Sequence, residues 1–574
     1  MPQNEAAMIP PTTPPEVQRK RGAPKGRRVS AEALVAVRAL LAGAPRRRDL
    51  LIEFLHRIQD THGCLSTAHL AALAQEMRMA QAEVFEVASF YHHFDVVREG
   101  KDPPPALTVR VCDGLACAMS GAQELIARLP ALLGTSVRVQ AVPCIGRCDQ
   151  APAVQVGQFA LAQASLARVT DAVTQGHTQA LLPEAIDLDA YVGAGGYQIL
   201  RECQAGARSL EAVIATLDEA GLRGLGGAGF PAARKWRAVL AQPQPRLLVV
   251  NLDEGEPGTF KDRVLLESDP HRFLEGALIA AWAIDAADVY LYLRDEYAGC
   301  RALLEREITA LETAPPVARL PTLHLRRGAG AYICGEESAL IESIEGKRGL
   351  PRLRPPYVAE VGLFGRPTLE HNLETLFWLP ELLERGGKWF AGQGRRGRQG
   401  LRRFSVSGRV REPGVKLAPA GISARELIDE HCGGMAEGQT LYAYLPGGAS
   451  GGILPASLAD LPLDFDTLQE VDCFIGSAAV IVLSDADRAV TAARNLMRFF
   501  KHESCGQCTP CRSGTAKMLT LIEREHWDLA ALADLSQVMR DASICGLGQA
   551  APNPVASVVR FFAHEIGPTP DAAQ

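Results

Sequence analysis

The stretch Glu503-Ser-Cys505-Gly-Gln-Cys508-Thr-Pro-Cys511-Arg-Ser-Gly514 decides the fold of the C-terminal part of this chain. Two residues between successive cysteines let one tight loop turn three thiolates toward the corners of a single cubane. A fourth cysteine, Cys545, closes the set from another segment. The spacing predicts a [4Fe-4S] cluster between helices that run to about Lys501 and from about Thr515. Structural zinc is the main alternative, although zinc prefers CxxC pairs.

A second set of cysteines lies in the N-terminal third of the chain: Cys112, Cys117, Cys144 and Cys148. The alternating stretches 107–111 and 137–142 predict strands, and each is followed by two of these cysteines. Four thiolates at one end of a sheet suit a [2Fe-2S] cluster, in which each iron atom needs two. A zinc site or a redox-active CxxxC pair remains open.

Composition limits the classes of function. The 574 residues are 47% hydrophobic and carry a net charge of −6, which describes a globular protein of several domains and gives no argument for a nucleic-acid partner. No apolar run reaches the roughly 18 residues of a membrane span. Fourteen cysteines without a secretory signal predict a reducing cytoplasm, where clustered thiols hold metal.

The organisation along the chain follows changes in periodicity and in proline and glycine content. Helical spacing covers the stretch from Ser30 to Phe94, an α/β pattern with Gly-rich loops fills the middle of the chain, and helices return after Ser484. A Pro-rich basic start reads as a disordered tail. The predicted units are a disordered basic tail (1–30), a helical bundle (31–100), a thioredoxin-like [2Fe-2S] domain (106–180), an α/β domain with the Gly-rich loops (185–400), a unit that resembles a ubiquitin-like (SLBB) domain (401–480) and a helical [4Fe-4S] domain (481–574).

The glycine-rich loop between Gly221 and Pro231 contains GxGxxG, which alone is weak evidence for a dinucleotide site. A helical run precedes it instead of a strand, and Pro231 stands where a long helix should open, so the Rossmann arrangement is missing. Glycines still let a flat ring or a phosphate lie against the backbone, and Arg223 and Lys235 offer positive charge. Tight turns without a ligand are the alternative.

Two more loops follow predicted strands. The loop Asn251-Leu-Asp253-Glu254-Gly-Glu256 follows the apolar run 247–250, and the loop from Gly328 to Glu337 again joins a strand to a helix. Ligands of α/β proteins bind at the carboxyl ends of strands, so the three loops predict one shared nucleotide pocket. A solvated acidic turn is the alternative for the first of these two loops.

Two one-electron clusters beside a nucleotide pocket create a mismatch, because nicotinamide exchanges two electrons as a hydride. A flavin accepts a hydride and releases electrons singly, so FMN is the predicted cofactor.

These motifs together resemble the flavin-bearing NADH dehydrogenase subunit of respiratory complex I, with its thioredoxin-like [2Fe-2S] partner fused in front. The resemblance rests on the loops at 221–231, 251–263 and 328–338, on Arg366-Pro-Thr368 with Asn372-Leu-Glu-Thr375, and on the CxxCxxC stretch. It implies a multidomain α/β and α fold that binds FMN, NAD, [4Fe-4S] and [2Fe-2S].

The resemblance also implies the site residues. Glu256 and Glu336 would be catalytic, and Glu254, Glu256, Glu337 and Phe230 would lie on the NAD side. Those expected around FMN and nicotinamide are Arg223, Gly224, Gly226, Gly227, Ala228, Gly229, Phe230, Lys235, Asn251, Asp253, Tyr332, Gly335, Glu336, Asn372 and Thr375.

Two departures from complex I bear on the partner. His371 stands where the family commonly has a first asparagine before Asn372, which puts that contact with FMN in doubt, and the spacing from Cys117 to Cys144 is short. A single-chain fusion with this spacing is most similar to the β (diaphorase) subunits of soluble NAD-dependent formate dehydrogenases. This implies a large molybdenum- or tungsten-containing partner with further clusters. An NAD-reducing hydrogenase, a complex I type enzyme and a non-enzymatic iron–sulfur scaffold are the alternatives.

Overall fold

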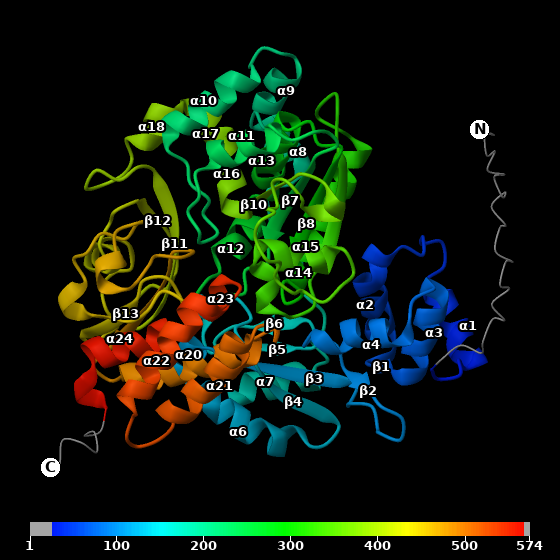
Figure 1. Ribbon diagram of the computed structural model, residues 1–574, viewed down its shortest axis with the longest axis horizontal. Coiled ribbons are helices and arrows are strands. Elements are labelled where there is room, and N and C mark those ends of the chain that lie inside the picture. Colours follow the sequence, from blue (N-terminus) through cyan, green and yellow to red (C-terminus); the bar gives the residue numbers. More distant parts are fainter. Residues whose placement is uncertain (1–25, 567–574) are drawn as a thin grey trace, which may run out of the picture.

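The computed structural model describes residues 26–566 and arranges them in five units (Figure 1). Most of the predicted basic tail therefore lies outside the described residues. The first unit is helical, as its periodicity predicts, and the side chains of Ser30 and Ser66 cap two of its helices. A short parallel pair of strands closes the unit. Its elements are α1 (Ala31–Leu40), α2 (Leu51–His62), β1 (Leu65–Ser66), α3 (Thr67–Met77), α4 (Gln81–Phe90) and β2 (Val96–Val97).

The second unit is a four-stranded sheet in the order β4-β3-β5-β6. The predicted strands are present, but the structure adds the short β6 and the five-residue α5, which were too short for periodicity to reveal. Cys112 ends β3, and α5 carries Cys117. The elements are β3 (Leu107–Cys112), α5 (Leu115–Met119), α6 (Ala122–Leu133), β4 (Val137–Val142), β5 (Val154–Val156), β6 (Phe159–Leu161) and α7 (Leu166–Thr174).

The third unit is built on a parallel sheet in the order β10-β7-β8-β9. Its two central strands, β7 and β8, are nearly continuous apolar runs that are buried along almost their whole length, whereas the edge strands β9 and β10 are more polar. Its strands are β7 (Leu247–Leu252), β8 (Asp288–Leu293), β9 (Thr322–Arg327) and β10 (Thr368–Asn372). Its helices are α8 (Leu188–Gly193), α9 (Gln198–Gln204), α10 (Leu210–Ala220), α11 (Ala232–Leu240), α12 (Lys261–Ser268), α13 (Pro270–Ala283), α14 (Ala298–Thr313), α15 (Glu337–Ile344), α16 (Leu373–Phe377), α17 (Leu379–Arg385) and α18 (Gly387–Ala391).

One detail of this unit corrects the sequence analysis. A helix, α11, does open directly after Pro231, and the proline serves as its N-cap residue because no N–H is needed there. The glycine loop is still preceded by the helix α10, so the strand–loop–helix arrangement of a Rossmann site is absent here.

The fourth unit is a five-stranded sheet in the order β12-β11-β15-β13-β14. A hairpin joins β11 to β12, and Ser423 and Glu426 form a capping box at the start of the following helix. The strands are β11 (Leu401–Gly408), β12 (Gly414–Pro419), β13 (Leu441–Leu445), β14 (Leu454–Pro455) and β15 (Ala479–Ser484), with α19 (Ala424–Glu426) after the hairpin.

The C-terminal helices lie against both the second and the fourth units (Figure 1). The helix after the cysteine loop begins at Thr509, earlier than the predicted Thr515, because Pro510 is tolerated in a first turn. Among residues 26–566, no helix is both long and apolar enough to cross a membrane. The helices are α20 (Ala489–Glu503), α21 (Thr509–Ile522), α22 (Leu529–Ala542), α23 (Gly546–Ala550) and α24 (Asn553–Phe561).

Candidate functional site

A cavity of about 340 Å³ lies at the carboxyl edge of the parallel sheet. All three predicted loops reach it, as expected for polar groups that follow parallel strands. Its size is within the range of small-molecule sites. The predicted residues that line it are Gly226, Gly227, Ala228, Asn251, Asp253, Glu254, Glu256, Tyr332, Gly335, Glu336 and Asn372.

The glycine loop needs its glycines at two positions. A Cβ on Gly226 would lie 2.9 Å from Cβ of Asn372, and Gly229 has φ +64° with the Phe465 ring 2.5 Å from the place of its Cβ. Thr375 fixes the loop, because its hydroxyl accepts a hydrogen bond of 2.9 Å from Leu225 N–H. The bare backbone is therefore held open toward the cavity.

Two carboxylates of the acidic loop have different surroundings. Glu254 is 6% exposed, and its carboxylate accepts from the N–H groups of Asp262 and Arg263 at 2.8 and 3.1 Å. Burial raises the pKa of Glu254 to about 7, with Asp262 adding to the effect. Glu256 accepts from the Tyr332 hydroxyl and from the N–H of Ser450 at 2.7 Å. Both carboxylates are thus held rigidly at the wall of the cavity.

The floor of the cavity holds a buried ion cluster. Nζ of Lys261, 1% exposed, lies 2.7 Å from Asp262 and 3.1 Å from Glu374. Burial alone would lower the pKa of Lys261, but these carboxylates outweigh it and raise the pKa, so the ammonium is charged. The amide of Asn372 donates to Asp262 at 2.6 Å, which links β10 to this cluster.

Two predicted ligand residues carry hydrogen bonds within the protein. The amide of Asn251 donates to the Gly335 carbonyl at 2.9 Å, and Glu336 caps α15 by accepting from the N–H groups of Ser338 and Ala339. His371 does not line the cavity: it is buried, and its Nε2 accepts from the indole of Trp236 at 2.8 Å. Asn372 alone of the adjacent pair therefore reaches the cavity.

Seven predicted residues do not line this cavity. Arg223 lies over the Phe465 ring at 4.6 Å, and Lys235 donates to the Glu370 carbonyl at 2.8 Å. Phe230 is 45% exposed beside the loop. Arg223, Lys235 and Phe230 therefore lie around the cavity without lining it. The seven are Arg223, Gly224, Gly229, Phe230, Lys235, Glu337 and Thr375.

Sequence reasoning missed the residues that the fourth and fifth units contribute. These close one side of the cavity with short glycine-containing segments. The Gly-rich run 446–452 was the available signal, but nothing in the sequence indicated that it folds against the acidic loop. The missed residues of these two units are Gly447, Ser450, Phe474, Gly476, Ser477, Gly546, Leu547 and Ala550; those missed within the third unit are Gly255, Thr259, Lys261, Asp262 and Ile333.

The four cysteines of the second unit converge as predicted and are all buried. Sγ of Cys144 lies 3.3 Å from Sγ of Cys148, and Cys112 contacts both Cys117 and Cys144. Hydrogen bonds from Cys112 and Cys148 lower the pKa of Cys144, which favours its thiolate, the form that binds a metal. The donor set fits a [2Fe-2S] cluster.

The C-terminal cysteines also share one small cavity. Cys505 and Cys508 come from the loop, Cys511 from the first turn of α21, and Cys545 from the N-cap of α23. Ile333 and Leu547 line both this cavity and the large one. Four thiols around one enclosed space fit a [4Fe-4S] cluster, and these two apolar side chains stand between it and the larger cavity.

Two buried arginines join the Cys144–Cys148 loop to the acidic loop. Arg294 donates to the Cys144 carbonyl at 2.8 Å and to the Glu254 carbonyl. Arg263 donates to the Gly146 carbonyl at 3.0 Å and to Asp149 at 2.9 Å. Arg294 donates to carbonyl groups of both loops, and Arg263 adds bonds to Gly146 and Asp149. These buried hydrogen bonds hold the second unit rigidly at the wall of the large cavity.

A nucleotide-sized cavity flanked by two cysteine sets defines the chain as an iron–sulfur flavoprotein. Family models match in three places: the Nuo51 FMN-binding domain at residues 217–381, the thioredoxin-like [2Fe-2S] ferredoxin at 37–177, and the NADH-ubiquinone oxidoreductase-F iron–sulfur binding region at 491–568. The predicted fold class and cofactors are thereby confirmed.

Relatives agree with these matches. The chain is 40% identical to an NADH-quinone oxidoreductase subunit of Rhizobium meliloti, over 67% of this chain and 94% of that protein. It is 42% identical to the mitochondrial NADH-ubiquinone oxidoreductase 51 kDa subunit of Neurospora crassa, over 62% of this chain and 76% of that one. The chain belongs to this family of NADH-oxidoreductase flavoprotein subunits, with a [2Fe-2S] domain in front.

A solved structure resembles nearly the whole chain. It is of an NAD+-reducing [NiFe]-hydrogenase in the H2-reduced state, with a TM-score of 0.80 and 32% identity, over 91% of this chain and 93% of that chain. The chain is therefore an NAD(H)-linked electron-transfer flavoprotein subunit with FMN and iron–sulfur clusters.

Proposed function

We propose that this chain is the diaphorase subunit of an NAD+-reducing formate dehydrogenase. Electrons enter from a large molybdenum- or tungsten-containing subunit, pass through the clusters to the flavin cavity and leave as hydride on NAD+. The observation that carries the electron-transfer role is the shared wall of Ile333 and Leu547 between the large cavity and the cysteine cavity.

We assign roles to the residues of the cavity on its geometry. The glycine backbone at Gly226 and Gly227 would hold the flavin against the cavity wall; when bound, the flavin would supply hydride exchange with nicotinamide and single-electron exchange with the clusters. Lys261, Asp262 and Asn372 are hydrogen-bonded to one another at the floor of the cavity and would support the flavin there.

The NAD side of the cavity is the wall that carries Glu256. Its carboxylate is oriented by Tyr332 and Ser450, so one oxygen is positioned to accept a hydrogen bond from a ribose hydroxyl. Glu254 acts through the backbone, because its carboxylate holds the start of α12. Phe230, exposed at the edge of the glycine loop, offers a ring for stacking.

A hydrogenase partner is the second candidate, and the likeness to the hydrogenase structure over 91% of the chain favours it. The two candidates differ in the metal of the large subunit. Copurification from the native host followed by metal analysis separates them: molybdenum or tungsten with formate-dependent NAD+ reduction supports the first, and nickel with H2-dependent reduction supports the second.

The role itself is tested on the isolated chain. Iron-replete protein should contain FMN and should reduce an artificial dye with NADH. Protein that carries both clusters but neither binds flavin nor reduces the dye would reject the diaphorase role and leave an iron–sulfur scaffold.

A further inference from the structure

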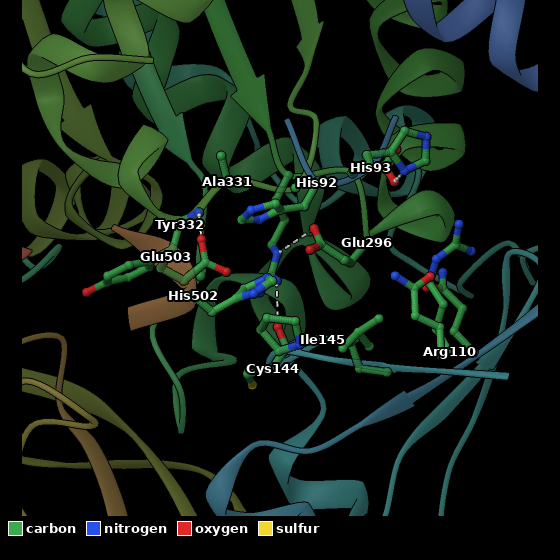
Figure 2. A pocket seen from close by; sticks show the side chains of 18 of the residues that line it. His92, His93, Arg110, Cys144, Ile145, Glu296, Ala331, Tyr332, His502 and Glu503 are labelled. Atoms are coloured by element: carbon green, nitrogen blue, oxygen red, sulfur yellow. Dashed lines mark hydrogen bonds and ion pairs between the residues drawn. The ribbon is translucent and has the colours of Figure 1, made fainter. Parts of the chain in front are cut away.

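A second cavity of about 180 Å³ lies where four of the five units meet. Residues of the first unit, of β4, of the loops after β8 and β9, and of the end of α20 line it. Figure 2 shows His92, His502 and Glu503 turned toward one another in this cavity, with Glu296 beside them. None of these four side chains lines the large cavity.

We propose that His92, His502 and Glu503 form a binding site for one zinc-type divalent cation. Each of the three offers a ligand atom within 4.8 Å of the other two. Tetrahedral zinc with bonds of about 2.0–2.1 Å needs ligand atoms about 3.3 Å apart, so small side-chain rotations complete the set. Two imidazoles and one carboxylate match the ligands that zinc takes when it keeps a fourth position open.

The fold brings the three ligands together before any metal arrives, with both imidazoles exposed and the carboxylate buried. The rings of His92 and His502 lie 4.2 Å apart between centroids, although they belong to the first and the last units of the chain. Glu503 is 6% exposed, and its Oε2 accepts from the N–H of Tyr332 at 3.0 Å. That bond fixes the carboxylate and leaves Oε1 without a hydrogen-bond partner among the described residues.

The charges around the site permit a cation. Arg294 at this cavity is compensated by an ion pair of 3.1 Å with Glu296, so the pair adds no net positive charge. Arg138 is paired with Asp95 at 2.6 Å. Imidazole is mostly neutral at pH 7, which is the form that binds a metal.

The chain offers a matched control pair. His62 and His69 also stack, with ring centroids 4.3 Å apart, but no third metal-ligating group completes a set with them among residues 26–566. A site that needs only two close imidazoles would bind at both pairs, whereas the proposed site needs the buried carboxylate as well.

The test uses protein loaded with FMN and both clusters. It is incubated with excess zinc chloride, passed through a desalting column and analysed for zinc and iron. We expect one added zinc per chain in the wild type and in His62→Asn, and at least a tenfold weaker affinity in His92→Asn with iron unchanged. X-ray absorption at the zinc edge should show only nitrogen and oxygen ligands.

Three outcomes would overturn the proposal: no retained zinc in the wild type, equal zinc in His92→Asn and wild type, or sulfur among the zinc ligands, which would assign the metal to cluster cysteines. His92 lies outside the C-terminal unit, so its variant remains informative even where His502→Asn disturbs the adjacent cluster loop.

Discussion

Arg263→Leu is the sharpest test of how the [2Fe-2S] unit is docked on the flavin unit. Arg263 is 2% exposed and donates to the Gly146 carbonyl at 3.0 Å, to Glu267 at 2.7 Å and to Asp149 at 2.9 Å. Side chains of Asp149 and Glu267 are 15% and 24% exposed, so both carboxylates would lose a largely buried partner.

The expected loss in the free energy of docking between the two units follows from the burial of Arg263. Removing one member of a buried ion pair costs about 3–5 kcal/mol, and the partial exposure of the two carboxylates places the loss near the lower end, at about 3 kcal/mol. Arg147→Ala is the matched control, because Arg147 pairs with Glu267 at 3.3 Å from a more exposed position. It should cost about 1 kcal/mol or less.

Hydrogen exchange measures this docking energy. Where opening is rapid, the exchange rate of protected amides follows the open fraction, so a loss of about 3 kcal/mol raises the rate by a factor of roughly 150 in the interface peptides around Gly146. The far strand β6 should exchange as in the wild type. A rise of less than tenfold in Arg263→Leu, or an equal rise in Arg147→Ala, would refute the reasoning.

Three further predictions concern the cavity and the clusters. Glu256→Ala should raise the KM for NADH roughly tenfold, because NADH loses one hydrogen bond to a charged group. The FMN content should stay constant. Loss of FMN with an unchanged KM would contradict this prediction. Burial holds the pKa of Glu254 at about 7 against an ordinary value of 4.5, so the folded state binds the extra proton and the free energy of unfolding falls as pH rises between those values. Glu254→Gln should weaken this dependence of the free energy of unfolding on pH, measured by urea titrations at several pH values. An unchanged pH dependence in the variant would contradict the assignment. Cys545→Ala should lose about four iron atoms per chain and keep the [2Fe-2S] signal, whereas Cys64→Ala keeps both clusters.

The sequence predicted those parts of the site that short-range spacing encodes. Cysteine spacing identified both cluster sites, and polar loops after strands identified one side of the cavity, because parallel strands end at one edge of a sheet. Ser450 and Leu547 were missed, since their positions depend on how separate units pack. The same limit applies to Arg263 and Arg294, which read as ordinary charged residues until the fold buries them against Gly146 and Cys144.

The two cluster sites meet the flavin cavity through walls of different chemistry. Toward the C-terminal cysteines the wall consists of the apolar side chains of Ile333 and Leu547, which line both cavities. Toward Cys144 the acidic loop forms the wall, and Arg294, which lies behind it, donates to the carbonyls of Cys144 and Glu254. Because Arg294 is also paired with Glu296 at 3.1 Å, its role here is to tie the Cys144–Cys148 loop to the acidic loop through hydrogen bonds. The [2Fe-2S] site is therefore joined to the cavity wall by a polar contact, whereas the [4Fe-4S] site is separated from the cavity by two apolar side chains.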